Sequence, residues 1–312
     1  MIQVLFSLKS FREHIHQLNT IDPIVLTIKN LFNQIECSNT SIETYLYVQS
    51  LELPHYQPGV QFDAHECLLH ILNLIYPPRP DNSVPDESVF QISSLESILC
   101  QTCNNASENT LLDTICPISF PDPYRMNSIQ IEIERLTNDP HGELVQSYPC
   151  VNCPTRTNAT KARTVLNISD FIIFQLKLYH YDLTTATAHK LVPNLQIELE
   201  IENILLGTLT LHAIVYHHGN TPRSGHYTSA VKYNNTWFLV DDQRISNVVR
   251  FTCTMDDYMV PYLLIYKKKT GAVVIPNDNI VCDLLPEISS PDITESFNLV
   301  SPGLTLPMFF IK

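Results

Sequence analysis

Long apolar segments are missing from this sequence of 312 residues. The apolar run Phe171–Phe174 already ends at Gln175, whereas a membrane-spanning helix needs about 18 or more apolar residues. The N-terminus has neither the basic segment nor the small-residue cleavage site of a signal peptide. We therefore expect no membrane partner and no secretion, and we expect the protein in the cytoplasm, the nucleus or both.

Glycine and positive charge are also scarce. Only 7 glycines stand against 21 prolines, which excludes a collagen-like chain or a flexible glycine-serine linker. The 19 lysines and arginines against 32 acidic residues give a formal net charge of -13, which argues against binding to the phosphate backbone of nucleic acids. Hydrophobic residues make up 44% and charged residues 16%, as in a folded chain of about two structural units.

The first quarter of the sequence has the periodicity of helices. Apolar residues recur with a 3.6-residue period over 4–18 and predict a helix from the first residues onward. Pro23 fits the first turn of a second helix that ends near Ile35. A third helix is predicted over 41–51, and a fourth over 61–76 with one apolar face.

The character changes after a proline-rich loop at 77–86. Apolar and polar residues alternate over 128–136, 195–203 and 209–218, where β-branched residues are frequent, so we predict three strands there. From residue 271 onward the chain contains prolines and has no period. We expect a loosely ordered tail in that segment.

Four cysteines carry the strongest chemical signal. Cys100 and Cys103 are separated by two residues, and so are Cys150 and Cys153. A two-residue gap lets both thiolates of one turn face the same ion, and two such turns complete a tetrahedral site that favours zinc. The alternative is two unrelated turns with free thiols. The other five cysteines have no partner at ligand spacing and are expected to be structural.

A histidine between two predicted strands is the second signal. The first strand ends at His217 or His218, a loop follows, and the second strand starts at His226. This strand should turn at Asn234–Asn235 and return to Asp241, which could bring a carboxylate next to the imidazole. A histidine oriented by an aspartate is two-thirds of a nucleophilic triad. A surface histidine at a strand end is the alternative, and the residues alone identify no nucleophile.

The segment SGHYTSAVKYNNTWFLVDD at 224–242 resembles the histidine box of the ubiquitin-specific proteases, whose pattern is Gly-His-Tyr, a short strand, then Trp and two acidic residues. Further blocks resemble the family's in the same order; they are QFDAHECLLHIL at 61–72, LCQTCNNASENT at 99–110, YPCVNCPTRTNATKARTV at 148–165, DFIIFQLKLYHYD at 170–182 and PYLLIYKKK at 261–269. The likeness covers about residues 1 to 269.

This resemblance implies a papain-like α+β cysteine-protease fold. Its parts would be a helical thumb over 1–95, zinc-bearing β fingers over 96–165, a β palm with the histidine loop over 166–270, and the tail over 271–312. The implied activity is that of a thiol-dependent deubiquitinase, which cleaves the isopeptide or peptide bond after the C-terminal glycine of ubiquitin. The implied partners are ubiquitin or ubiquitinated proteins, and the zinc would be structural because four thiolates leave no position for water.

Carried over residue by residue, the resemblance makes His226 the general base, Asp241 its orienting partner and Asp242 a second acid. Tyr227 would line the narrow channel for the ubiquitin tail.

Asp63 and Glu66 would face the arginines of that tail, since carboxylates suit planar guanidinium groups. The pair also fits a helix capping box, so tail binding, capping, or both remain open.

The nucleophile is the main departure from the family pattern. The family's cysteine precedes the first helix, and the residues from Met1 resemble those immediately after that cysteine segment, so the nucleophile would lie a few residues before Met1. We therefore expect the chain as given not to hydrolyse ubiquitin conjugates. Smaller departures are Cys67 where the family usually has Phe, and Leu178-Tyr179 where it usually has Arg-Phe.

Two other hypotheses belong to different functional classes. A natural pseudoenzyme would bind ubiquitin without cutting it and would keep the zinc site and the tail contacts. A zinc-ribbon scaffold or nucleic-acid adaptor is opposed by the net charge of -13 and by the lack of a basic, aromatic-rich stripe.

Overall fold

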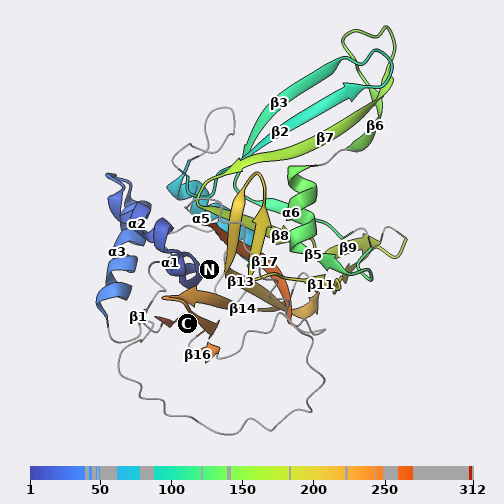
Figure 1. Ribbon diagram of the computed structural model, residues 1–312. Helices are drawn as coiled ribbons and strands as arrows, with labels where there is room; N and C mark the ends of the chain where they lie inside the picture. Colours follow the sequence, from blue (N-terminus) through green and yellow to red (C-terminus); the bar gives the residue numbers. More distant parts are fainter. Residues whose placement is uncertain are drawn as a thin grey trace.

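Figure 1 shows the computed structural model of the chain. The residues that the structure describes are 1–38, 42–43, 47, 49, 62–77, 88–120, 122–138, 142–182, 184–221, 224–242, 244–248, 259–269 and 309–310. They form a mixed fold that consists mostly of strands, as the sequence predicts. None of the described helices has the length and apolar character needed to span a bilayer.

The helices within the described residues are α1 (Ile2–Ser7), α2 (Lys9–Gln17), α3 (Pro23–Cys37), α5 (Ala64–Ile75) and α6 (Ile129–Thr137). In Figure 1, α1, α2 and α3 lie together on one side of the large sheet. The predicted helices at the N-terminus, after Pro23 and over 61–76 are all present. Of the predicted helix 41–51, only residues 42–43, 47 and 49 are among those described, and Ile42–Glu43 is the short strand β1.

The N-terminal helix is divided in two. Leu8 adopts an extended conformation (φ -78°, ψ 94°) and separates α1 from α2, whereas the period predicts one continuous helix. All six residues of α1 are buried, and the Ser7 hydroxyl donates to the Val4 carbonyl at 2.7 Å. Helix α1 is therefore a core element rather than a surface helix.

Side-chain caps explain where two of the helices begin. Asp22 Oδ1 accepts from the backbone N–H groups of Ile24 and Val25 at 2.8 and 3.1 Å, and Pro23 occupies the first turn of α3. Asp63 caps α5 in the same way. These contacts satisfy N–H groups that have no partner inside the helix.

The large sheet has eight strands. Its order is β16-β15-β14-β13-β17-β8-β4, and β12 pairs with β13 outside this path. The bounds are β4 (Cys116–Ile118), β8 (Phe171–Leu176), β12 (Glu200–Asn203), β13 (Gly207–Thr221), β14 (Ser224–Tyr233), β15 (Thr236–Asp241), β16 (Arg244–Val248) and β17 (Met259–Lys268).

A second sheet of four strands has the order β3-β2-β7-β6. It projects away from the body of the molecule in Figure 1. Its strands are β2 (Ile92–Cys100), β3 (Ala106–Asp113), β6 (Glu143–Tyr148) and β7 (Thr157–Ile168). The two ends of this sheet differ in burial, because Ile92 and Ile168 at its base belong to the core while most of β3 and β6 is exposed.

Short strands complete the fold. The pairs are β9 (Tyr179–Asp182) with β10 (Thr187–Lys190), β5 (Asn127–Ser128) with β11 (Leu195–Gln196), and β1 with β18 (Phe309–Phe310). The rest of the predicted tail over 271–312, and residues 78–86 of the predicted loop over 77–86, lie outside the described residues.

The prediction of a strand over 128–136 is wrong, because this segment forms α6. Ile129 and Ile133 are fully buried, whereas Ile131 is 57% exposed, which fits a helical rather than an alternating period. Ser128 caps the helix by accepting from the Ile131 N–H, and Gln130 donates to Glu134 one turn later. Isoleucine at every second position suits a strand, but Ile129 and Ile133 are also about one helical turn apart, and the cap favours the helix.

Two strand predictions change in length. The segment 195–203 forms the separate strands β11 and β12 rather than one strand, and Tyr266 Oη donates to the Glu198 carbonyl between them at 2.8 Å. The predicted loop after His218 is shorter than expected, because β13 continues to Thr221 and β14 already starts at Ser224.

A row of phenylalanines joins the helices to the large sheet. The ring of Phe32 on α3 contacts Phe6 and Phe11 at centroid distances of 5.5 and 6.1 Å. Phe11 contacts Phe90 at 5.4 Å, and Phe90 contacts Phe171 on β8 at 5.5 Å. All five rings are buried, so the N-terminal helices and the sheet share one close-packed core.

Candidate functional site

The pair of His226 and Asp241 lies at one end of the large sheet. Strands β14 and β15 are antiparallel, and Asn234 and Asn235 between them both have positive φ angles (46° and 63°), as a tight two-residue turn requires. This turn sets the register that brings Asp241 beside the start of β14. His226 Nε2 and Asp241 Oδ1 are 2.6 Å apart, so the expected hairpin and the expected contact are both present.

Asp242 joins this pair from the turn after β15. Its Oδ2 lies 4.0 Å from His226 Nε2, and its positive φ of 49° turns the chain immediately after the strand. About half of the His226 side chain is exposed. The two carboxylates can orient the imidazole, while the exposed side of the ring stays open to a reacting group.

Gly225 allows this arrangement. A Cβ atom at this position would lie 2.1 Å from the His218 carbonyl oxygen and 2.5 Å from His217 Nε2. The glycine therefore lets β14 approach β13 closely just before His226. The conformation does not require a positive φ here, whereas Gly219 on β13 has a φ of 113°.

The other side of β14 contacts a cluster of buried polar rings. Tyr227 packs against His217 and Tyr262, with centroid distances of 5.0 and 6.0 Å. Burial, and secondarily the charge of Asp63, raises the pKa of Tyr227 and that of Tyr262, so both phenols remain protonated near neutral pH. Tyr179 Oη lies 3.0 Å from His217 Nδ1.

His217 is held neutral in this cluster. Burial, followed by the charges of Lys190 and His218, lowers the pKa of His217 to about 4. Lys190 Nζ donates to the carbonyl oxygens of His217 and Gly219 at 3.0 and 2.7 Å. These bonds stabilise the end of β13 that pairs with β14 beside His226.

Asp63 connects α5 to the same cluster. Its Oδ1 accepts from the N–H groups of His65 and Glu66, and Tyr262 Oη donates to Oδ1 and Oδ2 at 3.1 and 2.9 Å. The capping role expected for Asp63 is therefore present. The Glu66 side chain is exposed and remains accessible to a binding partner.

The start of α1 lies near Asp242. Burial lowers the pKa of the Met1 amino group, whereas the nearby Cys67 and Asp242 side chains raise it. Burial raises the pKa of the Cys67 thiol, so Cys67 is not an activated nucleophile.

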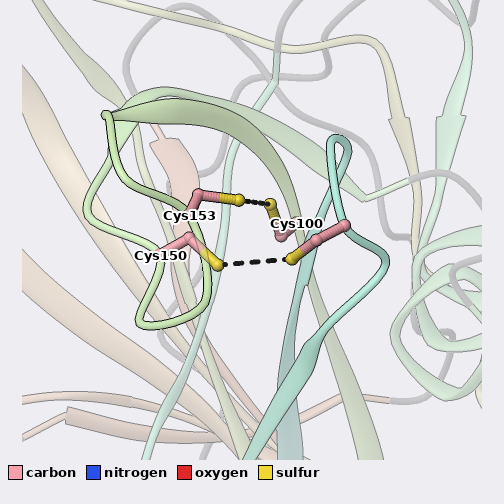
Figure 2. Close-up of side chains that lie close together, drawn as sticks. Cys100, Cys150 and Cys153 are labelled. Atoms are coloured by element: carbon pink, nitrogen blue, oxygen red, sulfur yellow. Dashed lines mark hydrogen bonds between the residues drawn. The ribbon is translucent and has the colours of Figure 1, made fainter.

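The four cysteines at the predicted ligand spacing meet at the far end of the four-stranded sheet. Figure 2 shows Cys150 and Cys153 on one turn facing the end of β2. The sulfur atoms of Cys100 and Cys153 are 3.8 Å apart, those of Cys103 and Cys150 are 3.5 Å apart, and all four lie within 4.8 Å of one another. All four cysteines are free thiols.

This sulfur arrangement fits a metal ion. Four ligands at tetrahedral positions about 2.3 Å from zinc would lie about 3.8 Å from each other. The hydrogen bond with Thr157 lowers the pKa of the Cys100 thiol to about 6, which favours the thiolate that binds metals. Burial raises the pKa of Cys153 to about 12, a shift that a bound cation reverses. The four cysteines could thus hold a metal ion.

Comparison with known proteins adds the family. The family model described as ubiquitin carboxyl-terminal hydrolase matches residues 1–266. This chain belongs to that family. The match confirms the resemblance to ubiquitin-specific proteases that the histidine box and the other blocks indicate.

Curated relatives are similar over most of this chain. Ubiquitin carboxyl-terminal hydrolase 26 of Oryza sativa subsp. japonica is 25% identical over 268 residues, which are 80% of this chain and 24% of the relative. Hydrolase 26 of Arabidopsis thaliana is 25% identical over 280 residues, 81% of this chain and 25% of the relative. Ubiquitin carboxyl-terminal hydrolase 23 of Arabidopsis thaliana is 22% identical over 278 residues, which are 82% of this chain and 30% of the relative. The chain thus spans about a quarter of the length of the first two relatives.

Sequence reasoning missed three residues that organise the sites of this hydrolase-family chain. Tyr262 and His217 hold Asp63 and Tyr227 in place, and Thr157 bonds to Cys100. Tyr262 and His217 could have been found as polar residues inside otherwise apolar strands, in PYLLIY and HAIVYHH respectively. For Thr157 no signal was available, because the contact depends on the register between β2 and β7.

We predict that Gly225→Ala destabilises the chain. The added methyl group would enter the space of the His218 carbonyl and the His217 ring, and overpacking of this kind costs about 1–3 kcal/mol. Urea unfolding followed by fluorescence gives the free energy of unfolding. Ser224→Ala, one exposed residue away, is the control and should change it by less than about 0.5 kcal/mol. Equal stability of the two variants would refute the packing argument.

Proposed function

We propose that this chain is the catalytic domain of a cysteine-type deubiquitinase. The reaction would cleave the isopeptide or peptide bond after the C-terminal glycine of ubiquitin. The observation that carries the proposal is the 2.6 Å contact between His226 and Asp241 inside a family match that covers residues 1–266. Ubiquitin or ubiquitinated proteins would be the partners, in the cytoplasm, the nucleus or both.

The geometry supports distinct roles for the acidic residues. Asp241 engages Nε2 of His226, so Nδ1 is the ring nitrogen that would take a proton from a thiol. Asp241 would keep the ring oriented and stabilise the imidazolium that forms, and Asp242 would add negative charge at 4.0 Å. The thiolate would then attack the carbonyl carbon of the last glycine, and His226 would return the proton to the leaving amine.

The nucleophile would come from a cysteine on the N-terminal side of α1. The position of Met1 near Asp242 and Cys67 supports this, because a residue just before α1 would lie close to the histidine. Among the cysteines that the structure describes, none is within hydrogen-bond distance of His226. We therefore propose that the 312 residues by themselves bind ubiquitin without cleaving it, which is also the behaviour of the alternative, a ubiquitin-binding pseudoenzyme.

The ubiquitin tail would bind between α5 and β14. Glu66 is exposed and would pair with an arginine of the tail. Asp63 already accepts bonds from two backbone N–H groups and from Tyr262, so its carboxylate would act mainly by fixing α5 and by its charge. Tyr227, held by its ring contacts with His217 and Tyr262, would form a wall of the channel.

The fold would be papain-like, with a thumb over 1–95, fingers over 96–165 and a palm over 166–270. The helices α1, α2, α3 and α5 would supply the thumb, and the four-stranded sheet would supply most of the fingers. Zinc held by Cys100, Cys103, Cys150 and Cys153 would be structural, because four thiolates complete its coordination and leave no site for water.

Ubiquitin binding tests the proposed recognition. We expect the 312-residue chain to bind ubiquitin in a calorimetric titration, and Glu66→Gln to weaken binding about tenfold, since a charge-assisted hydrogen bond contributes roughly 1.5–3 kcal/mol. Glu13→Gln removes an exposed carboxylate on α2 and is the matched control, expected to bind as the native chain does. Absence of binding at millimolar ubiquitin, or equal affinities of the two variants, contradicts the proposed tail contact.

Covalent labelling tests the proposed nucleophile. Ubiquitin with a C-terminal electrophile should leave the mass of the 312-residue chain unchanged, because no described cysteine contacts His226. A natural chain that carries a cysteine just before α1 should gain one ubiquitin and lose this reaction with His226→Ala. Labelling of the 312-residue chain that His226→Ala abolishes would place the nucleophile among its own cysteines and overturn the assignment.

Metal removal tests the zinc site. We expect about one zinc per chain by elemental analysis, and Cys150→Ser or a chelator should lower the free energy of unfolding by more than about 3 kcal/mol, because metal binding and folding of the site are coupled. Cys37→Ser changes an exposed thiol outside the cluster and serves as the control. Identical melting curves for native chain, Cys150→Ser and chelated protein would exclude a structural metal.

A further inference from the structure

A cavity of about 580 Å³ lies at the opposite end of β14 from His226. Its walls come from the helices α1 and α2, strands β13 and β14, the turn at Asn234–Asn235 and the end of β17. Lys232, on this cavity, follows His226 by six residues, so at about 3.3 Å per residue the two sites are about 20 Å apart. The cavity is thus separate from the candidate active site.

The lining of this cavity is strongly basic. Six of the chain's 19 lysines and arginines line it, and among the residues that the structure describes no aspartate or glutamate does; the six are Lys9, Arg12, Lys232, Lys267, Lys268 and Lys269. The whole chain has a formal net charge of -13, so this concentration of positive charge runs against the overall balance. Such a local field attracts anions.

Three of the six cations are paired with carboxylates. Lys9 lies 3.6 Å from Glu13, Arg12 lies 2.7 Å from Glu36, and Lys269 lies 2.6 Å from Glu200.

The other three cations have no carboxylate partner among the described residues. Lys268 Nζ donates to the neutral Asn167 side chain at 3.1 Å, and Lys267 Nζ lies 5.9 Å from the centre of the Phe171 ring. Lys232 forms no ion pair with any residue that the structure describes. Three positive charges from two strands therefore remain available to a ligand.

The positive charges of the cavity influence the pKa of His212, which lies on its wall. Burial lowers the pKa of His212 to about 4, and the charges of Lys267, Lys232 and Arg12 contribute to the lowering. The imidazole is thus neutral near pH 7, with Nε2 bonded to the Ser7 carbonyl at 3.2 Å. The positive charge of the cavity therefore comes from its lysines and Arg12 rather than from His212, and ammonium groups suit phosphate oxygens.

A hydroxyl group without a partner also lines the cavity. The Thr210 Oγ1 atom is buried and forms no hydrogen bond with any described residue. Buried hydroxyl groups are normally satisfied, so an orphan hydroxyl beside unpaired cations indicates a place where a ligand oxygen binds. Thr210 pairs with Lys267 in the sheet, which puts the hydroxyl-bearing residue next to one of the free lysines.

We propose that this cavity binds a small ligand that carries two or more phosphate groups. The volume lies in the range of small-molecule sites, and three unpaired ammonium groups match several anionic oxygens. A nucleic acid or an anionic membrane would also meet the acidic remainder of the chain, which disfavours large polyanions. The site does not depend on the proposed deubiquitinase activity, and its ligand is tested without ubiquitin.

Calorimetric titration of the full 312-residue chain with inorganic tripolyphosphate, at physiological salt, tests this site. We expect one binding site per chain, and Lys232→Gln/Lys267→Gln should weaken binding at least about tenfold because each lost charge-assisted bond is strong. The control Lys29→Gln/Lys161→Gln changes two lysines outside the cavity by the same chemistry and should bind within about twofold of the native chain.

A second variant keeps the test independent of folding defects. Thr210→Val removes only the orphan hydroxyl, so it should leave the melting temperature unchanged or raised while it weakens tripolyphosphate binding severalfold. No binding at millimolar tripolyphosphate, or equal weakening by both lysine pairs, overturns the proposal. So does binding confined to vesicles with phosphatidylinositol bisphosphate or to a single-stranded oligonucleotide, because either result identifies a surface for large polyanions instead.

Discussion

Strand β13 is hydrogen-bonded to β14 on one side and to β17 on the other over most of its 15 residues, and β12 pairs with its beginning. This pairing determines where both ends of the large sheet present their side chains. At one end His217 and His218 support β14 beneath His226, and at the other end Thr210 and His212 line the basic cavity. Because side chains alternate between faces, a shift of one residue in this register would dismantle both sites at once.

The candidate active site could be predicted where its geometry is local. The residues Asn234–Asn235 predict the turn of the hairpin that brings His226 beside Asp241. The two-residue spacing within each cysteine pair predicts the cluster of four cysteines. Contacts made across the fold could not be predicted in this way. Tyr262 reaches Asp63 from a strand 199 residues away, and only the packing of α5 on the sheet creates that bond.

The errors at the level of secondary structure have identifiable causes. In SIQIEIERL the isoleucines recur at every second position, which satisfies a strand, while Ile129 and Ile133 are also one helical turn apart. The cap at Ser128 and the bond from Gln130 to Glu134 favour the helix, and these terms are small individually. The histidine loop was predicted too long because Thr221 and Ser224, polar residues near glycines, still pair with each other and extend the two strands.

The phenylalanine row from Phe32 to Phe171 has a mechanical consequence. Every ring in it is buried and touches the next, so α1 cannot shift against the sheet unless several aromatic side chains change rotamer together. The core packing thus fixes the position of α1 relative to the sheet. An adjustment at this end of the molecule therefore requires fewer coupled side-chain changes in the half-exposed His226 than in α1.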